Sequence, residues 1–201
     1  FLGSSSLLSE NDISKESIKD SHYLLIEGYL VTSEATLNVG IAAINMAHEN
    51  NIKTVITLSD PNIVSYFRDN MMKLFSKKSH IIFCNEQEAL NFSQADNLKD
   101  AEAFLKEITD MYIITLGSKG AICSDGTSNH KILGHQVESK DFTGAGDMFL
   151  GAFMHQYTDT NILESMKFAN YCASKIIQIY GAKFNNSNDY QELRKDFKSL
   201  I

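Results

Sequence analysis

Residues 141–147 read Asp-Phe-Thr-Gly-Ala-Gly-Asp and stand directly before an amphipathic stretch of helical periodicity. The small side chains of Gly144, Ala145 and Gly146 allow backbone N–H groups to approach an anion, and a helix N-terminus favours negative charge. Asp147 would stand beside that anion, where a phosphate would repel a carboxylate. The arrangement makes sense if Asp147 takes a proton from an attacking hydroxyl group. A glycine-containing turn with an acidic N-cap is the alternative that the local sequence leaves open.

Asn85 and Glu88 form a second pair with chemical potential, directly after an apolar run at residues 81–84. Residues three apart share one face of a helix, so the amide and the carboxylate can act together. Oxygen atoms of these two types suit a hydrated Mg²⁺, a hard ion that prefers oxygen ligands and retains water. An ordinary helix start would explain the same residues.

Two further segments combine small and polar residues. Residues 115–120 read Thr-Leu-Gly-Ser-Lys-Gly and lie between two predicted strands, so a plain hairpin turn would account for Gly117 and Gly120. Residues 168–174 read Phe-Ala-Asn-Tyr-Cys-Ala-Ser and lie within a predicted helix. Small residues such as Ala173 are also what a simple helix–helix contact needs.

The elements that must position these groups follow from the hydrophobic pattern. Short β-branched apolar runs alternate with longer stretches in which apolar residues recur at helical spacing. The predicted strands are residues 23–26, 54–58, 81–84, 112–116 and 121–124, with a further strand or hairpin arm through 130–137. The predicted helices are residues 34–50, 61–75, 86–92, 98–108, 146–157, 162–179 and 190–200. Such alternation predicts an α/β fold with a mostly parallel central sheet and helices on both of its faces.

The composition narrows the class of protein. The chain has 201 residues, of which 43% are hydrophobic and 21% are charged, as is typical of a globular domain. A formal net charge of -7 argues against nucleic-acid binding, because such proteins present a basic face. No apolar run approaches the roughly 20 residues that cross a bilayer, so no membrane partner is expected. Cys84, Cys123 and Cys172 stand far apart in apolar surroundings and are expected to be reduced thiols of a cytoplasmic protein.

In chain order, the motifs resemble those of the PfkB family of carbohydrate and nucleoside kinases, which share the ribokinase-like fold. Asn-x-x-Glu at residues 85–88, Thr-x-Gly-x-x-Gly at 115–120 and Asp-x-Thr-Gly-Ala-Gly-Asp at 141–147 follow one another as they do in that family. Glu-Gly-Tyr-Leu at 27–30 and Leu-Ser-Asp-Pro at 58–61 are similar to its adenosine-kinase-like branch. The resemblance implies an ATP-dependent kinase that phosphorylates a hydroxyl group of an adenosine-like nucleoside or of a sugar.

The resemblance also implies catalytic roles. In the family, the Gly-Ala-Gly backbone forms an anion hole for the transferring phosphoryl group, and the last Asp deprotonates the acceptor hydroxyl. Here the anion hole falls on Gly144, Ala145 and Gly146, and the catalytic base is Asp147. Phe142 stands where the family often has Thr, and no effect on the chemistry is expected from that change.

Cofactor sites are implied in the same way. Asn85 and Glu88 match the motif that orders Mg²⁺ and the phosphates, with the metal held through water. Asp141 and Thr143 would bind a monovalent cation such as K⁺. The residues implied to contact ATP are Asn85, Glu88, Thr115, Gly117, Gly120, Asn170 and Ala173.

The resemblance runs through nearly the whole chain and implies which part of the family fold these residues form. Residues 1–201 are expected to form a single α/β domain, the ATP-handling C-terminal portion of the fold. The lid and the N-terminal substrate-binding part of the family are expected to lie outside these residues, and the chain opens without a methionine. Because the acceptor is chosen mostly by that part, a hexose or other sugar kinase and a non-catalytic nucleotide-binding domain are alternatives. Dimerisation through the lid occurs in parts of the family and would concern the full-length protein as a homodimer.

Overall fold

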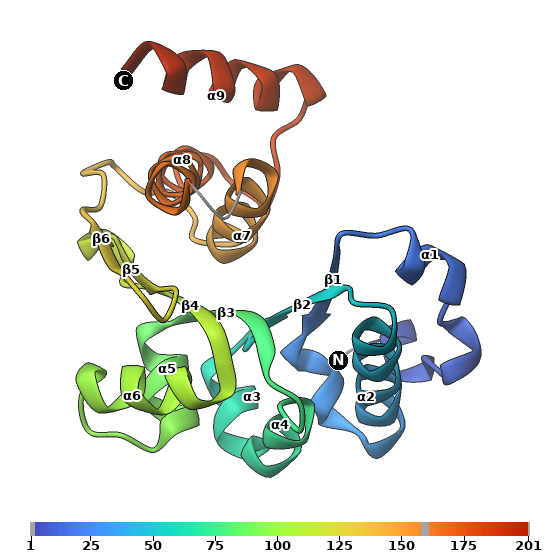
Figure 1. Ribbon diagram of the computed structural model, residues 1–201. Coiled ribbons are helices and arrows are strands. Elements are labelled where there is room, and N and C mark those ends of the chain that lie inside the picture. Colours follow the sequence, from blue (N-terminus) through green and yellow to red (C-terminus); the bar gives the residue numbers. More distant parts are fainter. Residues whose placement is uncertain (1–2, 158–160, 201) are drawn as a thin grey trace. The chain divides into compact units, whose positions relative to one another are not determined.

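Residues 3–157 and 161–200, which the computed structural model describes, contain a six-stranded sheet with the strand order β1-β2-β3-β4-β5-β6 (Figure 1). The strands are β1 (Tyr23–Glu27), β2 (Lys53–Thr57), β3 (Ser79–Asn85), β4 (Thr109–Thr115), β5 (Ala121–Ser124) and β6 (Asn129–Ile132). The helices are α1 (Lys15–Lys19), α2 (Glu34–Glu49), α3 (Pro61–Tyr66), α4 (Arg68–Leu74), α5 (Glu86–Ser93), α6 (Leu98–Ile108), α7 (Ala145–Gln156), α8 (Ile162–Ile176) and α9 (Ser187–Leu200). The predicted α/β fold with a mostly parallel sheet is confirmed.

The chain divides into two compact units. Unit 1 comprises Phe1–Ile114 and Cys123–Asn129, and unit 2 comprises Thr115–Ile122 and His130–Ile201. The expectation of a single domain over residues 1–201 stays a prediction.

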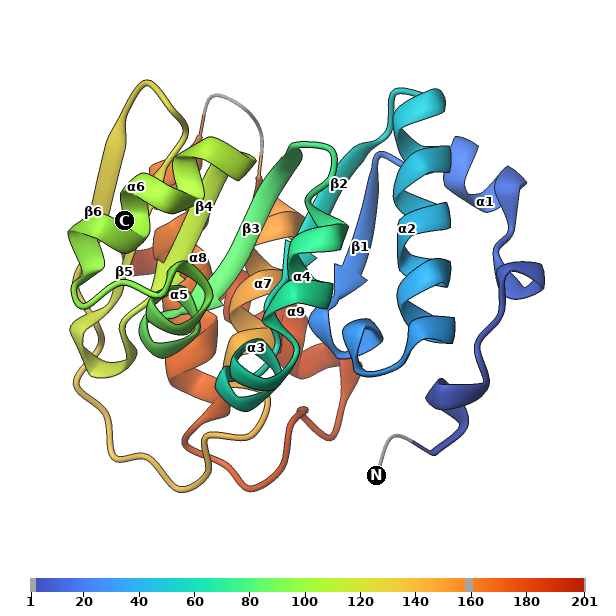
Figure 2. The same cartoon turned by 90° about the horizontal axis from the view of Figure 1, so that it is seen from below.

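In unit 1, β1 pairs with β2 and β2 pairs with β3, both in parallel. The register places Leu25 opposite Val55 and Val55 opposite Ile81. The strands are added in one direction, and strand–helix–strand connections are right-handed, so successive connecting helices fall on the same face. Helices α2 to α6 accordingly lie together on one side of β1 to β4 (Figures 1 and 2).

The core of unit 1 fills the space between these strands and helices. Adjacent residues of the central strands, such as Val55 and Ile56, are both buried, as expected for strands inside a parallel sheet. Behind them, the ring of Phe92 on α5 lies 5.3 Å from that of Phe75 and 5.3 Å from that of Phe104, measured between centroids. The Phe104 contact is edge-to-face, a favoured geometry for aromatic pairs.

Unit 2 is built around the contact between α7 and α8, which lie side by side (Figure 1). Helix α9 packs on α8 through Phe197, whose ring centroid lies 5.3 Å from that of Phe168 and 5.7 Å from that of Tyr171. These aromatic contacts fix the position of α9 on α8, and the three helices form the frame that holds the candidate site.

Three predicted helices differ from the observed ones by more than two residues, and one of them, predicted at 190–200, begins three residues earlier, at Ser187. The predicted helix 61–75 is broken at Phe67, whose φ of -122° and ψ of 29° depart from helical geometry. The predicted helix 162–179 ends at Ile176. The carbonyl group of the next residue, Ile177, instead accepts hydrogen bonds from the N–H groups of a loop in the same unit.

Smaller differences occur near the chain start and at β6. The sequence pattern gave no indication of α1, which begins after the N-cap residue Ser14. β6 ends at Ile132 although a strand or hairpin arm through residue 137 was predicted. Gly134 then approaches the Ser118 carbonyl so closely that a Cβ atom there would clash. Residues 133–137 therefore form a wall of a pocket in place of a longer strand.

Other expectations concern the cysteines and the membrane. Cys84, Cys123 and Cys172 are buried thiols, and burial raises the pKa of both Cys123 and Cys172 to about 12. Within residues 3–157 and 161–200, no helix combines the length and the apolar character needed to traverse a bilayer.

The aromatic cluster of unit 1 gives a test of the fold. Replacing Phe92 by Ala removes a fully buried ring that contacts two others, so the free energy of unfolding should fall by about 3–5 kcal/mol. Urea unfolding followed by circular dichroism measures this loss. Tyr66→Ala, at a side chain that is 82% exposed, is the control and should change stability by less than about 0.5 kcal/mol. Equal effects of the two substitutions would contradict the packing described.

Candidate functional site

The loop that leads into α7 is tied to the end of α8 within unit 2. One carboxylate oxygen of Asp141 accepts a 2.9 Å hydrogen bond from the Thr143 N–H, and the other accepts one of 2.9 Å from the Gly181 N–H. The N–H groups of Lys140 and Asp141 both donate to the carbonyl oxygen of Ile177, at 2.7 and 3.2 Å. The hydrogen bonds that the Asp141 carboxylate accepts, first that from Gly181 and then those from Thr143, lower its pKa below the ordinary value. The loop is therefore held at both ends before the helix begins.

Helix α7 starts from a left-handed residue. Gly144 is the N-cap with φ of 79°, and its carbonyl accepts the first helical bond, from the Met148 N–H at 2.8 Å. The Ala145 N–H turns back to the Phe142 carbonyl at 3.1 Å. The N–H groups of Gly146 and Asp147 lie in the first turn, where an α-helix has no internal acceptor to offer them. This turn can therefore receive an anion.

The two glycines of the motif have different physical reasons to be glycine. A Cβ atom at Gly144 would lie 2.8 Å from atoms of Ala182, and its positive φ disfavours any other residue. Gly146 has helical geometry, and a Cβ atom there would meet nothing within 4 Å. Packing within the described residues does not explain Gly146, whereas an approaching ligand would.

Beside this turn lies a pocket of about 220 Å³, here called the α7–α8 pocket, which belongs entirely to unit 2. Its lining residues are Thr115, Gly117, Ser118, Gly120, His135, Gln136, Val137, Ser139, Phe142, Ala145, Gly146, Phe149, Asn170, Ala173, Ser174 and Ile177. None of these sixteen residues is Asp, Glu, Lys or Arg. The pocket therefore suits an uncharged flat group, and the first turn of α7 beside it can bind a negatively charged one.

The wall of this pocket depends on close backbone contacts. Gly120 has φ of 100°, and a Cβ atom there would clash with the Ile132 carbonyl. Gly134 meets the Ser118 carbonyl in the same way from the other side. The side-chain amide of Asn170, on α8, donates a 2.9 Å hydrogen bond to the Leu133 carbonyl. Two glycines and one amide thus hold the turn, the wall and the helix around the pocket.

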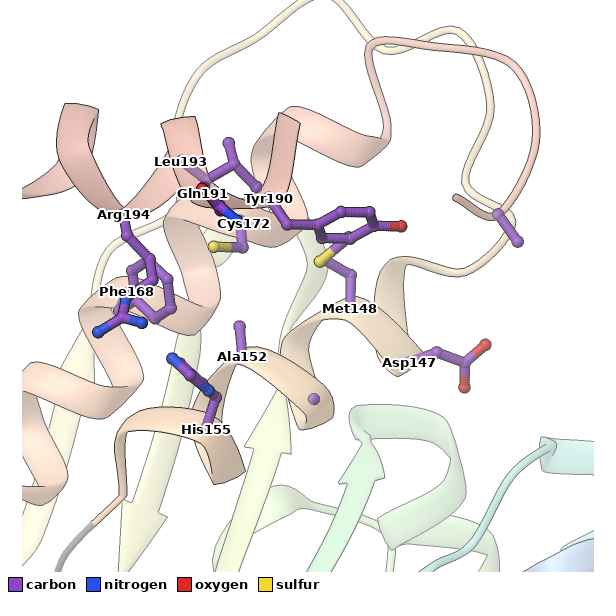
Figure 3. Close-up of a pocket in the computed structure, with 12 residues that line it drawn as sticks. Asp147, Met148, Ala152, His155, Phe168, Cys172, Tyr190, Gln191, Leu193 and Arg194 are labelled. Carbon is purple, nitrogen blue, oxygen red and sulfur yellow. The ribbon is translucent and has the colours of Figure 1, made fainter. Parts of the chain in front are cut away.

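Asp147 lines a second pocket of unit 2, of about 470 Å³, between α7, α8 and α9 (Figure 3). Its interior is formed largely by apolar residues such as Ala152, Phe168 and Leu193. The Asp147 carboxylate points away from these side chains and is exposed (Figure 3). Asp147 therefore comes directly after Gly146 of the α7–α8 pocket in the sequence, and its exposed carboxylate can meet an incoming hydroxyl group.

Asn85 and Glu88, in unit 1, hold each other at the start of α5. The Glu88 carboxylate accepts hydrogen bonds from the backbone N–H of Asn85 at 2.9 Å and from its side-chain amide at 2.6 Å. The side-chain oxygen Oδ1 of Asn85 in turn accepts a hydrogen bond from the Glu88 N–H at 2.8 Å, which completes a capping box. Burial raises the pKa of Glu88 to about 7, the N–H of Asn85 opposes this rise, and the negative charge of Asp60 adds to it.

Comparison with known proteins identifies the family. The model of the pfkB family carbohydrate kinases matches residues 4–189 of the chain. The chain belongs to the PfkB family. It is 27% identical over 206 residues to a ribokinase of Dictyostelium discoideum, an alignment that covers 94% of this chain and 63% of that protein.

Solved structures agree with this assignment. An adenosine kinase from Sinorhizobium meliloti has a TM-score of 0.87 and 25% identity, with 96% of this chain and 59% of that chain covered. An E. coli protein described as a ribokinase II, in complex with ATP and Mg²⁺, has a TM-score of 0.81 and 20% identity, with 95% and 64% covered. The chain thus spans about six-tenths of the length of these PfkB relatives.

The PfkB motifs predicted from the sequence separate between the two units. Thr115, Gly117, Gly120, Asn170 and Ala173 meet in the α7–α8 pocket together with Ala145 and Gly146. Gly144 caps the helix, and Asp147 lines the neighbouring pocket. Asp141 and Thr143 are joined by a hydrogen bond in the loop before α7, and their binding of a monovalent cation stays a prediction. Asn85 and Glu88 lie in unit 1, and the ligand contacts of all these residues likewise stay predictions.

Three residues of the α7–α8 pocket were not predicted from the sequence. His135, Gln136 and Val137 line it, although they were expected to continue a strand. Gly134, directly before them, was a usable signal, because a glycine inside a predicted strand often marks a close backbone approach. Phe142 was noted only as a departure from the family pattern, yet its side chain also lines the pocket.

Gly144 and Gly146 give a matched test of the loop geometry. Gly144→Ala should lower the free energy of unfolding by about 1–3 kcal/mol, because it combines a positive φ with a clash against Ala182. Gly146→Ala meets open space in helical geometry, so it should leave stability unchanged or raise it by up to about 1 kcal/mol. Thermal and urea unfolding of both variants measure the difference. A Gly146→Ala variant as unstable as Gly144→Ala would rule out the geometry described.

Glu88 gives a test by pH. Its carboxyl group has a pKa of about 7 when folded, against an ordinary 4.5, so the folded chain holds this proton more tightly. The resulting stability is complete below pH 4.5 and is lost as the pH rises through 7, a change on the order of 3 kcal/mol. Glu88→Gln cannot titrate, so urea unfolding with a chelator at about pH 5 and about pH 8 should show a gain relative to the parent at the higher pH. A parent–variant difference that is the same at both pH values would contradict the raised pKa.

Proposed function

We propose that the protein transfers the terminal phosphoryl group of ATP to a hydroxyl group of a nucleoside or a sugar. The observation that carries this proposal is the first turn of α7. There a Cβ atom at Gly146 would meet nothing within 4 Å, Gly146 lines the α7–α8 pocket, and the next residue, Asp147, exposes a carboxylate. The N–H groups of this turn have no acceptor within the helix. A phosphate-binding turn and a general base are thereby one residue apart.

The donor nucleotide would occupy the α7–α8 pocket. Its volume of about 220 Å³ lies below the roughly 300–1,000 Å³ that encloses a drug-sized ligand. The base and ribose would fill it, and the phosphates would extend to the N-terminus of α7. The absence of formal charge among the sixteen lining residues suits the neutral part of ATP, and the helix dipole suits the charged part.

The reaction would be driven by position and by electrostatics. Helix N–H groups at the transferred phosphoryl group stabilise charge as it moves onto the equatorial and leaving oxygens. The Asp147 carboxylate would accept the proton of the attacking hydroxyl group, a step that typically contributes about 10²–10⁴-fold in rate. Asp141 would serve indirectly, since its two N–H contacts fix the loop that orients this turn.

Magnesium would be held in unit 1 through Asn85 and Glu88. The oxygen-only pair fits a hard, hydrated cation, and the buried Glu88 carboxylate near the charge of Asp60 would be stabilised by a positive ion. When bound, Mg²⁺ neutralises charge on the nucleotide phosphates. The E. coli relative described as a ribokinase II carries both ATP and Mg²⁺ in its structure, which supports the same cofactors here.

The acceptor class rests on the relatives. One is a ribokinase and another is an adenosine kinase, so both a free sugar and a nucleoside are candidate acceptors. Assays with ATP against ribose, adenosine and a hexose would separate a sugar kinase from a nucleoside kinase. We also propose K⁺ at Asp141 and Thr143, for which a higher rate in K⁺ than in Na⁺ at equal ionic strength would be the support.

Asp147→Asn tests the assignment of the base. The substitution keeps size and shape but removes the proton acceptor, so kcat should fall at least about a hundredfold in the complete protein. ATP binding, followed by calorimetry, should stay near that of the parent, because the helix N–H groups remain. Near-normal turnover in the variant would exclude Asp147 as the base, and loss of ATP binding would show that it acts on the nucleotide instead.

A further inference from the structure

Phe142 is an aromatic residue on a fixed loop with a free side chain. Its neighbours are held by the Asp141 contacts to Thr143 and Gly181, and its own carbonyl accepts the Ala145 N–H. Its side chain is nevertheless 70% exposed. The backbone is therefore rigid where the ring is uncovered, which is how a binding surface presents a contact residue.

The exposed ring belongs to the α7–α8 pocket. Val137, from the wall after β6, is a second apolar side chain of the lining that is exposed, at 36%. Ala145, Phe149 and Ala173 add small or apolar surface to the same lining. A single exposed hydrophobic residue needs no explanation, but two that line one uncharged pocket form a surface for a flat apolar group.

The nucleobase is the part of a nucleotide with two flat faces and no charge. Stacking on an aromatic side chain is worth a considerable share of binding energy, and it tolerates different bases because each has a π-face. The Asn170 amide of the pocket is already used internally, since it donates to the Leu133 carbonyl. Gln136 and Ser139 are exposed polar residues of the same lining, and the exposed Phe142 ring adds an aromatic face on which a base can stack.

We infer that Phe142 is a base-binding residue whose ring stacks on the nucleobase of the phosphate donor, in the pocket that Val137 also lines. The inference rests on the proposed use of the α7–α8 pocket for the donor. It adds that the base is recognised by its flat face, so that other purine nucleotides should be accepted with affinities close to that of ATP.

Tryptophan substitution tests the contact directly. The chain contains no tryptophan, so Phe142→Trp introduces a single indole whose fluorescence can be excited selectively. Titration with ATP and Mg²⁺ should quench this emission in a saturable way, because a stacked base shares the indole face. Inorganic tripolyphosphate has the phosphates without a base and should leave the emission unchanged. Tyr180→Trp, at a side chain of unit 2 that is 80% exposed and outside the pocket lining, is the control and should not respond to ATP.

Affinity gives the second measurement. Phe142→Ala should raise the Kd for ATP by roughly tenfold in calorimetry, the loss expected from one base–aromatic stack. Tyr180→Ala should leave the Kd within about twofold, since single exposed residues away from a site contribute little. GTP should bind the parent within about tenfold of ATP and lose affinity to the same extent in Phe142→Ala.

The outcomes separate this inference from the proposed function. Quenching by ATP together with a weakened Kd in Phe142→Ala would support stacking. ATP binding to the parent with no quenching, or with an unchanged Kd in Phe142→Ala, would overturn the inference and leave the kinase proposal standing. Equal quenching by tripolyphosphate would also overturn it. Failure of the parent to bind ATP at all would overturn both proposals.

Discussion

The contact on which the candidate site depends is the double hydrogen bond of Asp141 to the N–H groups of Thr143 and Gly181. It joins the loop before α7 to the segment after α8, and the Ile177 carbonyl reinforces the junction by accepting two N–H groups of the same loop. Gly144 can then take its left-handed cap conformation close against Ala182. The direction of the first turn of α7, and with it the position of Gly146 and Asp147, follows from this junction. A carboxylate that takes no part in the proposed proton transfer thereby helps to position the residues that would perform it.

The glycines of unit 2 fall into two groups that sequence alone does not distinguish. Gly120, Gly134 and Gly144 are required by the protein itself, because a Cβ atom at each would meet a neighbouring backbone or side chain. Gly117, Gly146, Gly151 and Gly181 face open space, so no neighbour within 4 Å accounts for the missing side chain. Gly117 and Gly181 still have positive φ angles of 58° and 90°, which is reason enough for glycine, whereas Gly146 and Gly151 do not. Gly146 is therefore the glycine of the motif whose presence points outward to a ligand.

The sequence was sufficient for features that depend on local pattern. The strand–helix alternation predicted the fold, and α6 and β5 were predicted with their observed bounds because each is delimited by its own periodicity and turns. Thr115, Gly117, Gly120, Asn170 and Ala173 were implied as a group by the family resemblance and not by local pattern, and they line one pocket. The break at Phe67 and the early end of α8 could not be predicted, and the wall at residues 133–137 had Gly134 as its one signal in the sequence. Each depends on local backbone geometry or on a contact between backbone segments, which hydrophobic periodicity does not encode.

The uncharged lining of the α7–α8 pocket has a consequence for ionic strength. Contacts of apolar walls with a neutral base involve no counterions, so salt should hardly affect that end of a nucleotide. Attraction of phosphates to the N-terminus of α7 is electrostatic and is screened by salt. In the proposed binding mode, a concentrated electrolyte would thus loosen the reacting end of the donor while its base stays seated. Nucleosides without phosphates would keep their affinity across the same range.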